Sequence, residues 1–390
     1  MIPISNNIMI LIKSILLGLL LIGFLIFKGN IERLIIVALI LIIINIFKSA
    51  KFKANCILVV LSGIIIGYIL GNFLLFYSIL SSDNGYKYSR RDNIEEGKDN
   101  KLSKPAVIIF SNGEPYLYDS SIVLKNIYNG KSFIKKAKAP IEAFKYKMAY
   151  ENMGSSKYSD LCNRIKDNLA IRLGVDYDLY SAYFNVYPFL YDEIVKLSKR
   201  YEKIILVPLI LGESEEYQIL KKQIEEDFIN INTDIRFSPF LWESKKLPKQ
   251  ILEKSIKAIG NDLREASGII LIISDRESIY DQTIFSNRLI AIMEQANFEK
   301  EKIICLKHND DENLLLKSIH NLKTKGASNI LIISISTLLE NVKDQYNIGE
   351  WVKSAAKKEF IDIKYINGWG IGENLLNELE YKIRITNLKN

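Results

Sequence analysis

Two segments of the chain, residues 203–217 (KIILVPLILGESEEY) and 329–346 (NILIISISTLLENVKDQY), have nearly the same pattern. Each is a short run of β-branched residues and leucines that ends in a polar, acidic turn and leads into a helical pattern. A strand that is apolar at nearly every position is buried on both faces, which is typical of parallel sheets covered by helices. Residues 187–201 and 311–325, just before each run, carry apolar residues at helical spacing. The repeat predicts two similar α/β halves.

Strands and helices alternate along residues 105–390. The predicted strands are residues 106–110, 176–184, 203–211, 234–238, 268–274, 302–307, 330–334 and 361–366. Helical patterns separate nearly all of them, so two doubly wound parallel sheets are the economical interpretation. We expect the first half at residues 105–265 and the second at residues 266–390. Ligands of such sheets bind beyond the carboxyl ends of the strands, so chemistry is expected in the turns that follow them.

The first eighty residues differ sharply in composition from the rest. Three segments are almost free of charge: residues 8–27, 34–47 and 55–80. About 20 apolar residues span the hydrocarbon core of a bilayer, so the sequence predicts about three transmembrane helices in residues 1–80. A cleaved signal peptide is the alternative for the first segment, but Lys13 interrupts it and two further apolar segments follow at once. Glycines at positions 63, 67 and 71 would allow another helix to approach the third segment closely.

Residues 81–104 are polar, mixed in charge and without periodicity, so they are expected to be a linker. The lysines and arginines that flank the apolar segments lean slightly toward a multi-pass protein of the cell membrane with its large domain in the cytoplasm. The three cysteines, at positions 56, 162 and 305, do not form a paired framework, which agrees with that side of the membrane. The net charge of +7 is interpreted as spread over helical faces, and no nucleic-acid partner is expected.

Three stretches resemble one known family. Residues 110–115 (FSNGEP), which close the first strand, resemble the opening glycine-proline turn of ferrochelatases. Residues 154–156 (GSS) resemble their glycine-serine motif, and residues 204–211 (IILVPLIL) resemble their proline-leucine strand. Residues 268–379 follow the layout of the same class II tetrapyrrole metal chelatase superfamily, which includes the cobalt and sirohydrochlorin chelatases. The resemblance, which covers residues 105–385, implies that a tetrapyrrole lies between the two halves and receives a divalent metal there.

The resemblance also implies particular residues. Those expected at the tetrapyrrole are Asn112, Gly113, Pro115, Ser155, Ser156 and Pro208, with Trp369 capping the cleft. The family places a histidine after the first strand of the second half, and Asp275 stands there in this chain. The family's glutamate in the turn after the third strand of that half falls near Lys343, between Glu340 and Asp344. Both substitutions count against ordinary ferrochelatase activity.

Carboxylates and one histidine are the candidate metal ligands. Asp275 suits a hard divalent metal, although an aspartate at a strand end is also a common helix N-cap. Glu213 begins an acidic cluster that is either a metal funnel or a helical first turn stabilised by the helix dipole. His308 follows a strand and is either a base or a surface residue. The catalytic candidates are Asp275, His308 and Glu340, and the metal candidates are Asp275, Glu213, His308, Glu340 and Asp344.

The leading hypothesis is a membrane-anchored, ferrochelatase-like protein that binds a tetrapyrrole and a divalent metal, iron, and inserts the metal in haem biosynthesis. The alternative is a non-catalytic protein that binds haem, another tetrapyrrole or a metal for sensing or hand-over at the membrane. A third is a periplasmic-binding-type module with the same two-lobed layout. The metal is expected as substrate or ligand, with no tightly bound cofactor. The lipid membrane, and another membrane helix or a second copy, are the other expected partners.

Overall fold

The structure is a computed structural model that describes residues 4–49, 54–82, 101–129, 133–228, 232–274, 277–307 and 312–388. The chain forms two compact units. The first, which we call the helical unit, comprises Met1–Ser89 and Leu117–Gly154. The second, the two-sheet unit, comprises Arg90–Tyr116 and Ser155–Asn390. Each unit is described by itself.

Three apolar helices form the larger part of the helical unit: α1 (Ile4–Ile26), α2 (Asn30–Ser49) and α3 (Ala54–Ser82). Each contains a stretch long and apolar enough to span a membrane, judged by length and composition. The predicted close approach at the glycines is confirmed. A Cβ atom added to Gly67 would lie 2.2 Å from the carbonyl oxygen of Ile15, so the backbones of α1 and α3 are in contact there.

Residues 117–154 complete the helical unit. They form α4 (Ser120–Asn129), α5 (Phe133–Ala137) and α6 (Ala139–Met153). One buried apolar cluster joins α4 and α6 to α1, and consists of Ile22, Ile26, Val123, Leu124, Tyr128, Ala139 and Ala143. The expected division placed these residues inside the first α/β half. The contacts group them with the apolar helices instead, because α1 and α3, rather than a sheet, cover their apolar faces.

The first sheet of the two-sheet unit is parallel, with strand order β2-β1-β3-β4. Its strands are β1 (Ala106–Ser111), β2 (Asp178–Tyr183), β3 (Lys203–Pro208) and β4 (Asp234–Phe237). The helices that connect them are α7 (Tyr158–Leu173), α8 (Leu190–Ser198) and α9 (Glu215–Asp227). The central strand β1 is buried at every position, as its continuous apolar sequence predicts.

The second sheet repeats this topology with strand order β6-β5-β7-β8. Its strands are β5 (Ser267–Ile273), β6 (Ile303–Lys307), β7 (Asn329–Ser334) and β8 (Asp362–Ile366). Its helices are α10 (Leu247–Ile259), α11 (Ile279–Gln295), α12 (Glu312–Thr324) and α13 (Val342–Glu359). All eight predicted strands and the two similar halves are therefore confirmed.

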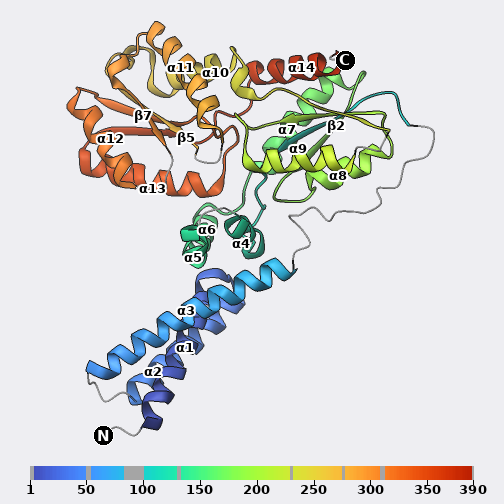
Figure 1. The fold of residues 1–390 in the computed structure, drawn as a ribbon. Coiled ribbons are helices and arrows are strands. Elements are labelled where there is room, and N and C mark those ends of the chain that lie inside the picture. The colour runs from blue at the N-terminus through green and yellow to red at the C-terminus, as the bar shows by residue number, and fades with distance from the viewer. Residues whose placement is uncertain are drawn as a thin grey trace. The chain divides into compact units, whose positions relative to one another are not determined.

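The last helix, α14 (Glu373–Leu388), follows the second sheet in sequence but packs on the first. Figure 1 shows it beside α7. The guanidinium of Arg172 on α7 lies 2.7 Å from the carboxylate of Glu373, and Arg236 in β4 donates to the carbonyl of Asn387 at 3.0 Å. The expected second half, residues 266–390, thus returns to the first half at its end.

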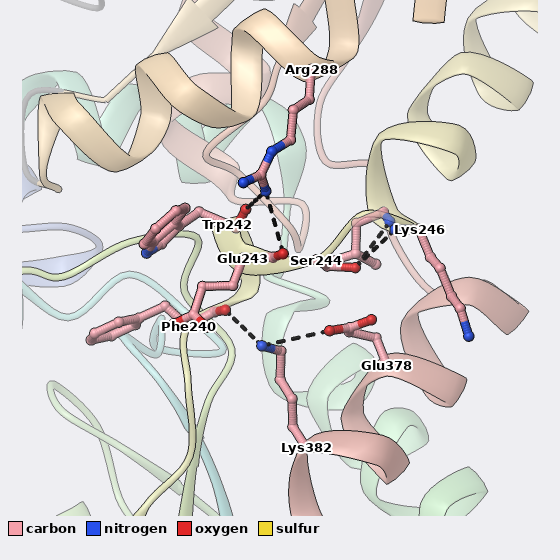
Figure 2. A network of polar contacts seen from close by, with 9 residues as sticks. Phe240, Trp242, Glu243, Ser244, Lys246, Arg288, Glu378 and Lys382 are labelled. Carbon is pink, nitrogen blue, oxygen red and sulfur yellow. Dashed lines mark hydrogen bonds and ion pairs between the residues drawn. The ribbon is translucent and has the colours of Figure 1, made fainter. Parts of the chain in front are cut away.

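A short segment at residues 240–246 is held from both sides where the chain passes between the halves (Figure 2). Arg288 on α11 donates to the carbonyl of Trp242 at 2.9 Å. Lys382 on α14, almost fully buried, donates to the carbonyl of Phe240 at 2.8 Å and lies 3.5 Å from Glu378. These bonds tie the passage to both halves and hold the halves together.

Candidate functional site

Glu114 lies in the turn after β1, at the carboxyl edge of the first sheet. Gly113 makes the turn tight: its φ is +78°, and an added Cβ would lie 2.7 Å from the Cβ of Tyr183. The Glu114 side chain is directed inward and the residue is only 9% exposed. Its carboxylate accepts a hydrogen bond from the hydroxyl of Ser156 and another from the backbone N–H of Val342 at 3.0 Å. Glu114 therefore reaches from the first half to the N-terminus of α13 in the second.

Glu277 occupies the corresponding place after β5. It is also 9% exposed, and its carboxylate accepts a hydrogen bond from the backbone N–H of Gly212 at 2.8 Å. The next residue, Ser278, donates its N–H to the carbonyl of Glu213 at 2.8 Å. Gly212 follows β3, just as Val342 follows β7. Each half thus sends the glutamate that follows its central strand into the turn after the third strand of the other half.

Both carboxyls titrate near neutral pH. Burial raises the pKa of Glu114 from 4.5 to about 7; the bonds from Ser156 and Val342 oppose this rise, and nearby Asp344 adds to it. Burial likewise raises the pKa of Glu277 from 4.5 to about 8, against the bond from Gly212. Groups with a pKa close to the working pH can take up and release protons, and they occur often at functional sites.

The predicted residues of the first β-turn and of the glycine-serine motif lie together in the structure. The N–H of Ser156 donates to the carbonyl of Tyr116 at 2.9 Å, and its hydroxyl bonds Glu114. Asn112, Gly113 and Pro115 belong to the same turn, Ser155 precedes Ser156, and Pro208 is buried at the end of β3.

Trp369, the predicted cap of the cleft, is 1% exposed. Its indole N–H donates to the carbonyl of Ile335 at 2.8 Å, and its ring centroid lies 6.5 Å from that of Phe285. The ring is enclosed by protein on the turn that precedes α14. Its contact with a ligand stays a prediction.

The candidate metal ligands are only partly placed. Asp275 and His308 lie outside the described residues. Glu213 is half-buried and Glu340 is exposed. Asp344 is in the first turn of α13, where its carboxylate accepts from the side-chain amide of Asn341 at 2.9 Å and its N–H donates back to Asn341 at 2.8 Å. Within the described ranges, no three histidine, cysteine, aspartate or glutamate side chains are grouped so as to hold a metal.

Glu114 and Glu277 were not singled out from the sequence. Their signal was positional: when the two halves are aligned on β1 and β5, a glutamate follows each strand within four residues. The family's glutamate was expected near Lys343. A carboxylate does lie at this place, since backbone N–H groups of Val342 and Lys343 lower the pKa of Glu114. It is supplied by the other half of the molecule, which sequence order does not reveal.

Comparisons with known proteins return structures only: no family model and no curated protein sequence matches the chain. The sirohydrochlorin chelatase SirB from Bacillus subtilis subspecies spizizenii, in complex with cobalt, is 9% identical with a TM-score of 0.47; the match covers 73% of this chain and 95% of that one. DR2241 from Deinococcus radiodurans, described as structurally similar to chelatases, is 9% identical with a TM-score of 0.45. The match covers 72% of this chain and 54% of that one. CbiX, described as the terminal enzyme of sirohaem biosynthesis in denitrifying bacteria, is 10% identical with a TM-score of 0.41. The match covers 72% of this chain and 98% of that one. At these identities the likeness concerns the fold alone.

Proposed function

We propose that the two-sheet unit binds a tetrapyrrole and a divalent metal between its two halves, as a chelatase-like module of a membrane-anchored protein. The observation that carries the proposal is the reciprocal placement of Glu114 and Glu277, each buried against the opposite half at the carboxyl edges of the strands. Ligands of parallel α/β sheets bind at these edges. The motifs at residues 110–115 and 154–156 support the same location, because both meet at Glu114.

Metal insertion has a proton requirement that these residues fit. One divalent metal replaces two pyrrole N–H protons of the macrocycle, so two protons must be accepted and passed on. Carboxyls with pKa values of about 7 and about 8 can each accept and release a proton near neutral pH. Glu114 and Glu277 are therefore proposed as the two proton acceptors, one from each half.

The metal is proposed to be iron, delivered as substrate. Asp275, His308, Glu213, Glu340 and Asp344 remain the proposed ligands. Carboxylate oxygen binds Fe(II), but a carboxylate without the burial that raises the pKa of Glu114 and Glu277 does not carry a proton near neutral pH as imidazole does. Because Asp275 stands where the family has histidine, we expect insertion into the porphyrin for haem synthesis to be slow.

The insertion rate tests this assignment. Full-length protein in detergent is mixed with Fe(II) and protoporphyrin or sirohydrochlorin, and the change of the macrocycle spectrum is followed with time. Glu114→Gln and Glu277→Gln should each lower the rate by roughly 10²- to 10⁴-fold, the usual contribution of a general base, while tetrapyrrole binding persists. Glu350→Gln is the matched control, because Glu350 lies on α13 and its carboxylate pairs with the exposed Lys353. Unchanged insertion rates in both glutamate variants would show that the two carboxyls are not the proton acceptors.

A non-catalytic binding protein is the second candidate. It is favoured by the substituted histidine position, where Asp275 stands. In this case the tetrapyrrole binds, but no metal is inserted by the wild type or by Asp275→His. Iron insertion that Asp275→His accelerates would instead support a weakened enzyme.

Membrane anchoring through α1–α3 is proposed from their length and composition. The protein should stay in the membrane pellet after alkaline carbonate extraction. Release into the supernatant would show that these helices do not span the bilayer.

A further inference from the structure

The helical insertion of residues 117–154 has an excess of lysines over acidic residues. It contains seven lysines and three acidic residues, a net charge of +4, whereas the whole chain has a net charge of +7. This segment therefore has a higher net charge per residue than the chain as a whole. A dense group of lysines fits an anionic partner, and its place in the fold indicates which one.

The insertion contacts the first two candidate membrane spans near the ends that adjoin each other, and the third span at Asn72, seven residues before its end. The hydroxyl of Tyr118 donates to the carbonyl of Ile26, the last residue of the first span, at 2.8 Å. The ammonium of Lys147 lies 2.7 Å from the carboxylate of Glu32, near the start of the second span. In α3, the side-chain amide of Asn72 donates to the carbonyl of Ala137 at 3.1 Å. If α1 and α3 span a bilayer, these contacts place α4–α6 at its surface.

Residues 134–141 of the insertion combine lysines with exposed apolar residues. Ile134 on α5 is 65% exposed, and Ile141 on α6 is also exposed. Lys138 is exposed between these helices, and the ammonium of Lys136 lies 5.9 Å from the ring centroid of Phe76 on α3. Apolar side chains that enter the acyl boundary, next to lysines that reach the headgroups, are typical of interfacial helices.

We propose that the insertion α4–α6 lies on the membrane and binds anionic phospholipid headgroups through Lys136 and Lys138, with Ile134 inserted between the lipids. The proposal rests on the membrane anchoring proposed above. It adds a lipid-selective surface to the helical unit.

Fluorescence quenching by lipids tests this surface. Full-length protein with Cys305→Ser and Ile134→Cys is labelled with a fluorophore and placed in nanodiscs, because Cys56 and Cys162 are buried. Trace lipid with a quencher on its headgroup is added as phosphatidylglycerol or phosphatidylcholine. We expect the label to be quenched by both, with a preference for phosphatidylglycerol that weakens at high salt.

Charge variants then assign the preference to the two lysines. Each lysine near an anionic surface contributes roughly fivefold to partitioning, so Lys136→Glu with Lys138→Glu should abolish the preference. Lys136→Arg with Lys138→Arg keeps the charge and should keep it. A label that neither lipid quenches, in protein that resists carbonate extraction, would overturn the proposal. So would equal quenching by the two lipids, or a preference that survives charge reversal.

Discussion

Glu114 and Glu277 are the residues whose ionisation is coupled to folding. Their pKa values rise from 4.5 to about 7 and about 8 on folding, so the folded state holds protons that the unfolded state has released. The stability that the protonated carboxyls contribute is complete below about pH 4.5 and is lost as the pH rises through 7 to 8. The sequence shows that Glu114 belongs to the turn after the first strand. Its hydrogen-bond partner Val342 lies 228 residues away, and no local sequence pattern links the two.

The first prediction is that Glu114→Gln with Glu277→Gln flattens this pH dependence. Each pKa unit corresponds to about 1.4 kcal/mol, so the shift of Glu114 alone corresponds to about 3 kcal/mol between pH 4.5 and 8. All three tryptophans belong to the two-sheet unit, so their fluorescence during denaturant unfolding reports on this unit. The wild type should lose more stability from pH 5 to pH 8 than the double variant. Parallel pH curves for the two proteins would contradict the raised pKa values.

At the scale of elements, α4 and α6 show what periodicity leaves open. The sequence predicted helical patterns between the strands, and α4 and α6 form between β1 and β2. An amphipathic pattern reports an apolar face but does not say what covers it, so the grouping with α1 and α3 could not be read from it. The eight strands were easier to predict from the sequence, because continuous apolar runs between turns have few other interpretations.

Lys147 provides the second prediction. It is 1% exposed, lies 2.7 Å from Glu32, donates to the carbonyl of Phe24 at 2.9 Å, and lies 4.9 Å from the ring centroid of that residue. Breaking a buried ion pair by removing one partner costs about 3–5 kcal/mol, so Lys147→Ala should loosen α6 from Phe24 on α1 and from Glu32 on α2. Limited proteolysis within residues 117–154 should accelerate strongly. Lys145→Ala removes the more exposed ion pair with Glu142, so this variant should be cleaved by the protease at the wild-type rate. Equal rates for both variants would argue against this anchor.

At the scale of the whole molecule, the division into units predicts which truncated chains fold. Residues 101–390 would leave the apolar faces of α4 and α6 uncovered and should aggregate. Residues 101–116 joined by a short glycine-serine linker to residues 155–390 should be soluble and unfold cooperatively, because Tyr116 and Ser156 are already hydrogen-bonded neighbours. Thermal melting and size-exclusion chromatography of the two chains check this third prediction. A soluble longer chain that unfolds cooperatively, together with an insoluble shorter chain, would contradict the division into units.

Orientation is the fourth prediction. The net charge of +4 in residues 117–154 adds to the earlier lean of the flanking lysines and arginines, so the large unit should face the cytoplasm. Cys305 is exposed and gives a direct reporter. A membrane-impermeant maleimide should label it only after cells are permeabilised. Labelling in intact cells would place the two-sheet unit outside and make a role in cytoplasmic tetrapyrrole chemistry untenable.

The central claim is that a tetrapyrrole binds between the two halves, and an equilibrium absorption titration of the full-length protein tests it most directly. Protoporphyrin and sirohydrochlorin are titrated separately without metal, so that binding is measured apart from insertion. The account predicts a saturable spectral shift with one macrocycle per chain for at least one of them, accompanied by quenching of the tryptophans in the two-sheet unit. Spectra identical to those of the free macrocycles, with unchanged tryptophan fluorescence, would contradict it.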